Sequence, residues 1–169
     1  GSLITADPDR IIFVSQKPRF ASENLGWIQY GDEVVSQNGL SFHSFVDFQY
    51  RPDRPTDQRY FVSGHHAWNL GYFVTSPRFL WKQYELYAPN VYQCLSRICS
   101  AWRTNRYGEI LQDVYPTLEK ISFDNAILEK LEPANALVVS ENIEWSDIGA
   151  WEALKEALQE ADDKNVTQG

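Results

Sequence analysis

The early part of the chain alternates apolar runs with polar turns, as β-strands do. Residues 11–14 form a continuous apolar run, which indicates a strand that is buried on both faces. Strand-forming residues over 25–30, and an alternation of Phe and Val with polar residues over 41–48, predict two further strands. The same reasoning predicts two later strands, over 68–75 and 136–139.

The remaining apolar residues recur at helical spacing. Ser76 followed by Pro77 is typical of a helix N-terminus, because the serine caps the helix and the proline lacks only an N–H that would be unpaired there. We therefore expect helices over residues 57–63 (stopped by Gly64), 77–87, 89–102, 107–115, 123–130 and 148–160. The helix that begins at Pro89 carries an apolar stripe that we expect to face the core, made of Val91, Tyr92, Leu95, Ile98, Cys99 and Trp102.

The length and composition are those of a folded domain. A chain of 169 residues holds one globular domain, or one well-filled half of a larger one. The hydrophobic fraction of 43%, with six Trp, nine Tyr and nine Phe, provides a core that a disordered chain lacks. We expect Gly1-Ser2 to be a tag remnant, residues 3–161 to fold and residues 162–169 to fray. Since the chain contains no Met, we expect either that a preceding segment was removed or that the chain is a piece of a longer polypeptide.

The charge of the chain narrows the class of partner. Fifteen Lys and Arg against 23 Asp and Glu give a formal charge of −8, which would repel nucleic acid over most of the surface. No apolar run approaches the roughly 20 residues that span a bilayer, and no secretory leader opens the chain. We expect a soluble, cytoplasmic protein with no membrane partner, in which Cys94 and Cys99 are buried free thiols.

Three groups of polar residues could carry chemistry, and each has a structural alternative. His65 and His66 could bind a metal, but adjacent strand residues point to opposite faces, so hydrogen-bonded or solvated histidines are favoured. Asp124 and Glu129 are five residues apart, which does not place two carboxylates on one helical face, so a paired acid–base site is poorly supported. Asp147 either caps the last predicted helix or projects a metal ligand into a cleft.

Five segments, taken together and in order, carry more information than any of them alone. They are Trp-Asn-Leu-Gly-Tyr-Phe at 68–73, Ser-Pro-Arg-Phe-Leu at 76–80, Tyr-Ala-Pro-Asn-Val-Tyr at 87–92, Ile-Ser-Phe-Asp-Asn-Ala-Ile-Leu-Glu-Lys at 121–130 and Trp-Ser-Asp-Ile-Gly-Ala-Trp-Glu-Ala-Leu at 145–154. This series resembles the second half of the mannose-1-phosphate guanylyltransferases. Upstream, residues 8–18 and 25–28 resemble the strand that leads into the sugar-contacting glycine segment of that family, so the resemblance covers residues 8 to 160.

The resemblance implies a fold and a reaction. The fold is α/β, a Rossmann-like nucleotidyltransferase mixed sheet with flanking helices. In the reaction a sugar 1-phosphate attacks the α-phosphorus of a nucleoside triphosphate, and pyrophosphate leaves. The implied substrates are mannose 1-phosphate and GTP, the implied product is GDP-mannose, and Mg²⁺ is the implied cofactor.

The resemblance also implies roles for individual residues. Gly26 allows the backbone to approach the sugar closely, and Asn69 hydrogen-bonds sugar hydroxyls. Asp124 borders the sugar pocket. Asp147 matches the catalytic carboxylate that helps to hold Mg²⁺.

The chain departs from the family at the position of a sugar-phosphate motif. Where such enzymes usually have Glu-Lys-Pro, with the Glu on sugar hydroxyls and the Lys on phosphate, this chain has Tyr50-Arg51-Pro52. Arg51 keeps the positive charge for the phosphate, whereas Tyr50 cannot replace an acceptor-only carboxylate. Asn24 and Leu25 also replace a glycine and an aromatic residue, which leaves the sugar selectivity open.

The glycine-rich loop that holds the triphosphate in this family has no counterpart in the sequence. Asp7 cannot supply the first metal-binding aspartate, because no helix fits between it and the strand over 11–14. Nucleotide-binding βαβ units take roughly 30 residues each, so we expect a whole catalytic domain to contain about a hundred further residues before this segment. We expect the chain to be the C-terminal, sugar-phosphate half of a catalytic domain and to be inactive on its own. The alternative is a non-catalytic sugar-phosphate-binding or oligomerisation module derived from that fold.

Overall fold

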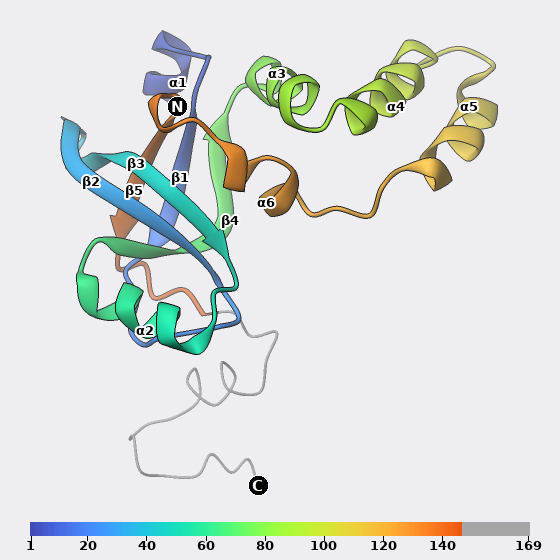
Figure 1. Ribbon diagram of the computed structural model, residues 1–169. Coiled ribbons are helices and arrows are strands. Elements are labelled where there is room, and N and C mark those ends of the chain that lie inside the picture. The colour runs from blue at the N-terminus through green and yellow to red at the C-terminus, as the bar shows by residue number, and fades with distance from the viewer. Residues whose placement is uncertain (147–169) are drawn as a thin grey trace, which may run out of the picture.

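The computed structural model describes residues 1–146, in which five strands form one mixed sheet (Figure 1). The neighbouring strands follow the order β1-β4-β2-β3-β5, and β5 returns to β1, so that the sheet closes into a barrel. The β1–β5 pair is parallel and the other four pairs are antiparallel. The expected mixed sheet is therefore confirmed. The strands are β1 (Ile11–Gln16), β2 (Gly26–Gln37), β3 (Leu40–Tyr50), β4 (His66–Thr75) and β5 (Ala136–Glu141).

The hairpin of β2 and β3 is longer than the sequence pattern indicated. We expected its first strand to end at Tyr30, before Gly31 and Asp32, but β2 continues to a turn at Asn38 and Gly39. These two residues have φ angles of 54° and 78°, which an Asn-Gly hairpin turn adopts readily. The Asn-Gly pair is the sequence signal that could have predicted this turn.

Closure of the barrel depends on that long hairpin. The register between β2 and β3 shifts at several points along its length, and such irregularities bend a strand pair and increase its twist. The bent hairpin brings β3 to β5, where His43 pairs with Val138 and Ser44 pairs with Leu137. No local pattern in the sequence indicates this pairing, so closure was not anticipated.

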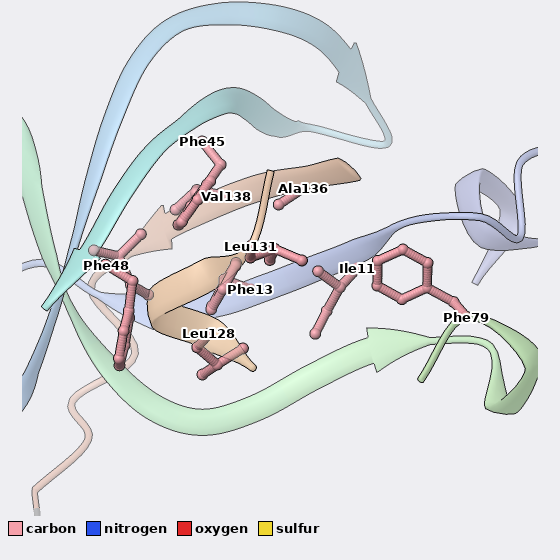
Figure 2. Packing of buried hydrophobic residues seen from close by; sticks show 10 residues of the cluster. Ile11, Phe13, Phe45, Phe48, Phe79, Leu128, Leu131, Ala136 and Val138 are labelled. Carbon is pink, nitrogen blue, oxygen red and sulfur yellow. The ribbon is translucent and has the colours of Figure 1, made fainter. Parts of the chain in front are cut away.

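Aromatic rings fill the inside of the barrel. Phe13 on β1 is 0% exposed, and its ring stacks on that of Phe45 at a centroid distance of 5.3 Å. Phe48 stacks on Phe13 at 6.4 Å. Leu128 and Leu131, which follow the last helix in the described part of the chain, join the same buried cluster (Figure 2). The burial of β1 confirms that it is an interior strand.

Helices flank the sheet, and local signals set their ends. Asp53 and Ser76 cap two of them by accepting hydrogen bonds from the backbone N–H groups of Thr56 and Phe79. Gly64 ends the first of these two in the left-handed conformation, with φ 71°. The helices are α1 (Ser2–Ala6), α2 (Arg54–Ser63), α3 (Pro77–Tyr87), α4 (Pro89–Ser100), α5 (Tyr107–Val114) and α6 (Phe123–Ala126).

Most of the predicted helices are confirmed, and two segments differ. α1 was not expected. The segment 123–130 was expected to be one helix, but α6 ends at Ala126 and a 3₁₀ turn follows over Leu128–Lys130. The helix predicted over 148–160 and the tail predicted to fray over 162–169 lie outside the described residues.

The α3, α4 and α5 helices form an arm that projects from the barrel (Figure 1). Within the stripe predicted to face the core, Ile98 is buried, but Val91, Tyr92 and Leu95 are half-buried and Trp102 is 59% exposed. The expectation that this stripe faces the core is wrong for most of its members. The reason is that α4 packs against α3 and α5 rather than over the sheet.

The two cysteines lie on the same arm. Both are free thiols, as expected. Cys94 is half-buried and Cys99 is exposed, so the expectation that both are buried is wrong, for the same reason. In the range 1–146, no helix combines the length and the apolar character that crossing a bilayer requires.

His66 opens β4 and is buried against α2. Its Nδ1 lies 2.6 Å from Ser63 Oγ, and its ring stacks on the ring of Tyr60 at a centroid distance of 4.0 Å. Burial lowers the pKa of His66 to about 4, and the neighbouring His65 acts in the same direction. The hydrogen-bonded interpretation is therefore confirmed for His66, while His65 is exposed.

Protonation of His66 is expected to destabilise the fold in mildly acidic solution. Its pKa is about 4 in the folded chain and about 6.5 in the unfolded chain, so between these values the unfolded state binds more protons. Stability therefore falls as the pH decreases through this window, by up to about 3 kcal/mol. Urea unfolding at several pH values should show that the free energy of unfolding falls more steeply with decreasing pH in the parent chain than in His66→Phe. Equal pH slopes in the two proteins would contradict this assignment.

Candidate functional site

The start of β2 lies between the end of β3 and the middle of β4. Gly26 pairs with Tyr50 on one side and with Asn69 on the other. A Cβ on Gly26 would lie 2.9 Å from Phe48 Cζ and 3.2 Å from Asn69 Cβ. Phe48 is held in the barrel core and the Cβ of Asn69 is fixed to its backbone, so neither can give way easily. The packing of three strands therefore requires glycine at this position.

A bulge in β4 sets the direction of the Asn69 side chain. The register of β4 against β1 shifts between Asn69 and Tyr72, and Gly71 within this bulge has φ 72°. Asn69 Oδ1 accepts a hydrogen bond from the Gly71 N–H at 3.1 Å. Asn69 Nδ2 donates to Asp124 Oδ1 at 3.0 Å. The amide therefore joins β4 to α6 and keeps its second N–H for another acceptor.

Asp124 lies in the first turn of α6 and is half-buried. Burial raises the pKa of its carboxyl, and the negative charge of Glu129 acts in the same direction. Hydrogen bonds from its own backbone N–H and from Asn69 lower the pKa. The net effect is a raised pKa, so Asp124 keeps its proton to a higher pH than an exposed aspartate does.

Glu129 reaches the same region from the other side of a break in the helix. Its Oε1 accepts a hydrogen bond from the Tyr50 N–H at 3.3 Å, and its Oε2 accepts one from Asn125 Nδ2 at 3.0 Å. Ile127, the residue that follows α6, has φ −126° and ψ −55°, so the five-residue spacing does not span a continuous helix. Glu129 is near enough to raise the pKa of Asp124, but the two carboxylates accept hydrogen bonds from different partners, and a paired acid–base site stays poorly supported. Glu129 is a further candidate residue, for which the spacing along the sequence predicted no role at the site.

Arg51 follows the last residue of β3 and supplies a positive charge. Its N–H donates to the Leu25 carbonyl oxygen at 3.2 Å, and its Nε donates to the Asn24 carbonyl oxygen at 3.3 Å. The guanidinium carbon lies 5.1 Å from the centroid of the Tyr50 ring. Arg51 is exposed and has φ 47°, a backbone conformation that is uncommon outside glycine.

Four of the five residues that the sequence predicted for the site lie together. We call this group, with two neighbours, the Gly26 cluster: Gly26, Tyr50, Arg51, Asn69, Asp124 and Glu129. The fifth predicted residue, Asp147, lies outside the described residues, so its roles as a helix cap or as a metal ligand stay predictions.

The described residues do not fit a metal centre by themselves. Over residues 1–146, no three His, Cys, Asp or Glu side chains are grouped so that they could hold a metal ion. Asp124 and Glu129 also accept hydrogen bonds from Asn69 and Asn125, respectively. The expected Mg²⁺ therefore stays a prediction.

No protein-family model matches the chain, but curated relatives do. Over 165 residues, it is 27% identical to mannose-1-phosphate guanylyltransferase of Escherichia coli, covering 97% of this chain and 34% of that enzyme. Over 155 residues, it is 30% identical to a putative mannose-1-phosphate guanylyltransferase of Vibrio cholerae serotype O1, covering 90% of this chain and 32% of that protein. The chain thus spans about a third of the length of these relatives.

Two solved structures share the fold. The crystal structure titled mannose-1-phosphate geranyltransferase, from Thermus thermophilus, aligns with a TM-score of 0.79 at 24% identity, over 99% of this chain and 45% of that one. Mannose-6-phosphate isomerase from Helicobacter pylori aligns with a TM-score of 0.64 at 20% identity, over 86% of this chain and 55% of that one. The resemblance of this chain to the mannose-1-phosphate guanylyltransferases, inferred from its motifs, is confirmed by the curated relatives, and the solved structures show that its fold is shared.

Proposed function

We propose that the chain is the sugar-phosphate-binding part of a sugar-1-phosphate nucleotidyltransferase. The whole enzyme would make GDP-mannose, or a similar nucleotide sugar, from GTP and mannose 1-phosphate and would release pyrophosphate. The observation that carries the proposal is the Gly26 cluster, in which Asn69 donates to Asp124 on one side of Gly26 and Arg51 lies against Tyr50 on the other. The names of the curated relatives support the same reaction class.

Members of the cluster have the chemistry that a sugar 1-phosphate needs. Asn69 can donate its second amide N–H, and Asp124 can accept from sugar hydroxyls. The Arg51 guanidinium presents a fork of N–H donors that suits phosphate oxygens. Nucleotidyl transfer depends mainly on placing the attacking phosphate oxygen in line with the α-phosphorus, so these residues would contribute by positioning.

The proposal includes a cofactor and a division of the chain. Mg²⁺ is the proposed cofactor, with Asp147 as the catalytic carboxylate that helps to hold it, and its chemistry would be to neutralise charge on the triphosphate. Residues 3–161 are proposed as the sugar-phosphate-binding part, and the whole enzyme is proposed to be cytoplasmic.

The first expected result is that the chain binds mannose 1-phosphate and that Asn69→Ala weakens binding by about tenfold, which corresponds to about 1.4 kcal/mol. The variant loses a donor to the sugar and leaves the Asp124 carboxylate without its amide partner. Isothermal titration calorimetry measures both affinities. Asn90→Ala, an exposed position on the arm, is the matched control and should bind like the parent. No binding by the parent chain would contradict the proposed function.

The second expected result is that the chain alone shows no nucleotidyl transfer. Positioning and charge neutralisation of the triphosphate provide most of the rate in such reactions, and the sequence contains no glycine-rich loop that would supply them. Incubation with each nucleoside triphosphate, Mg²⁺ and mannose 1-phosphate, followed by a pyrophosphate assay, tests this. Turnover above the no-enzyme background would contradict the interpretation of the chain as the sugar-phosphate part.

A non-catalytic module for sugar-phosphate binding or oligomerisation is the second candidate function. Tyr50 in place of an acceptor carboxylate favours loss of catalysis. Exposed apolar side chains on and beside the arm favour oligomerisation, since Leu86 is 64% exposed, Trp102 59% and Tyr115 63%.

If the arm mediates oligomerisation, the mass of the chain in light scattering should rise with concentration. Trp102→Lys should reduce this rise, because it places a charge within the apolar surface. Val62→Lys is the control, since Val62 is 79% exposed but lies on α2. A parent chain that stays monomeric at high concentration would exclude the oligomerisation function.

A further inference from the structure

We propose that Glu129 determines sugar specificity in the proposed site, by accepting hydrogen bonds from sugar hydroxyls in place of a carboxylate at position 50. The inference rests on the proposed function and adds to it a residue that neither the motif resemblance nor the comparisons assign. With Glu129 as the acceptor, a chain with Tyr50 could still bind the hydroxyl end of a sugar phosphate.

The first support is the location of the Glu129 carboxylate. Its Oε1 accepts from the backbone N–H of Tyr50 itself, at 3.3 Å. The carboxylate therefore lies against the backbone of the residue whose side chain departs from the expected acceptor. It comes from a segment that is 79 residues away along the chain.

The second support is the hydrogen-bonding capacity of that carboxylate. Two ionised oxygens can accept about four hydrogen bonds, and from residues 1–146 this pair accepts one from Tyr50 and one from Asn125. Glu129 is exposed, whereas Asp124 is half-buried and has a raised pKa. Glu129 is thus the more accessible acceptor of the two carboxylates.

The third support is a positive charge that also lies next to Tyr50. The Arg51 guanidinium carbon lies 5.1 Å from the Tyr50 ring centroid, so a cation and a carboxylate both lie beside position 50. A sugar 1-phosphate carries hydroxyls at one end and a phosphate dianion at the other. Glu129 suits the first end and Arg51 suits the second.

A purely structural role for Glu129 makes a different prediction. In that case the side chain only pairs the free N–H of Tyr50 at the end of β3 and orients Asn125. Glu129→Gln keeps an acceptor oxygen for that N–H, so it should preserve this structural contact. It removes the negative charge and the oxygen that accepts from Asn125 Nδ2. A structural role predicts that this loss affects sugar phosphate and inorganic phosphate alike, whereas a sugar-binding role predicts that it affects the sugar phosphate alone.

The test is a titration of mannose 1-phosphate and of inorganic phosphate into the chain and into Glu129→Gln. We expect Glu129→Gln to weaken binding of mannose 1-phosphate by about tenfold and to leave the affinity for inorganic phosphate within about twofold, because hydrogen bonds to a charged group contribute strongly and Arg51 is retained. Glu132→Gln, an exposed position with the same charge change, is the matched control. It should bind both probes like the parent.

A rescue variant tests whether a carboxylate at position 50 can replace that of Glu129. Tyr50→Glu introduced into Glu129→Gln returns a carboxylate to the cluster and should restore most of the lost affinity for mannose 1-phosphate. Thermal unfolding of each variant reports whether it is folded. If Glu129→Gln does not fold, Glu129→Asp takes its place: it keeps the charge but withdraws it, and it should lower sugar-phosphate affinity while phosphate affinity stays.

The outcomes separate this inference from the proposed function. If the parent binds mannose 1-phosphate and Glu129→Gln binds it equally well, the inference is overturned and the proposed function stands. If Glu129→Gln lowers the affinity for mannose 1-phosphate and for inorganic phosphate equally, Glu129 does not select for the sugar, and the inference is again overturned. If the parent does not bind mannose 1-phosphate, the proposed function and the inference both fail.

Discussion

The burial of two leucines inside the barrel holds the candidate site in place. Leu128 and Leu131 are 1% and 6% exposed and pack in the cluster that contains Phe13 (Figure 2). Burial of each such side chain contributes roughly 1.5–3 kcal/mol. The adjoining α6 helix is too short to be stable alone, so this anchor is what keeps Asp124 against β4 and Glu129 against β3.

Backbone irregularities gather at the same place. The bulge in β4 contains Gly71 at φ 72°, and Arg51 just beyond β3 has φ 47°. Phe48 and Asn69 leave no space for a Cβ at Gly26. Each feature departs from a regular sheet and is held by the surrounding packing. Bulges and unusual backbone conformations are common at ligand-binding sites, which fits the proposed role of the Gly26 cluster.

In the proposed site, different residues would bind the phosphate end and the hydroxyl end of the sugar phosphate. The chain carries a formal charge of −8, so its surface as a whole does not attract a phosphate ligand. Charges more than about 8 Å away are largely screened at physiological ionic strength, and phosphate binding would therefore depend on the nearby Arg51. The hydroxyl end would depend on Asn69, Asp124 and Glu129, which accept or donate hydrogen bonds without adding positive charge.

The sequence by itself determined the features that depend on neighbours along the chain. Ser76-Pro77 and Gly64 set helix ends, the apolar run over 11–14 marked an interior strand, and ordered motifs identified four members of the Gly26 cluster. Only the tertiary structure decided the closure of the barrel, the partial exposure of the apolar stripe on α4, and the approach of Glu129 to Tyr50. These depend on contacts between segments far apart in sequence, where helical spacing cannot tell which partner covers a face or where packing will interrupt a helix.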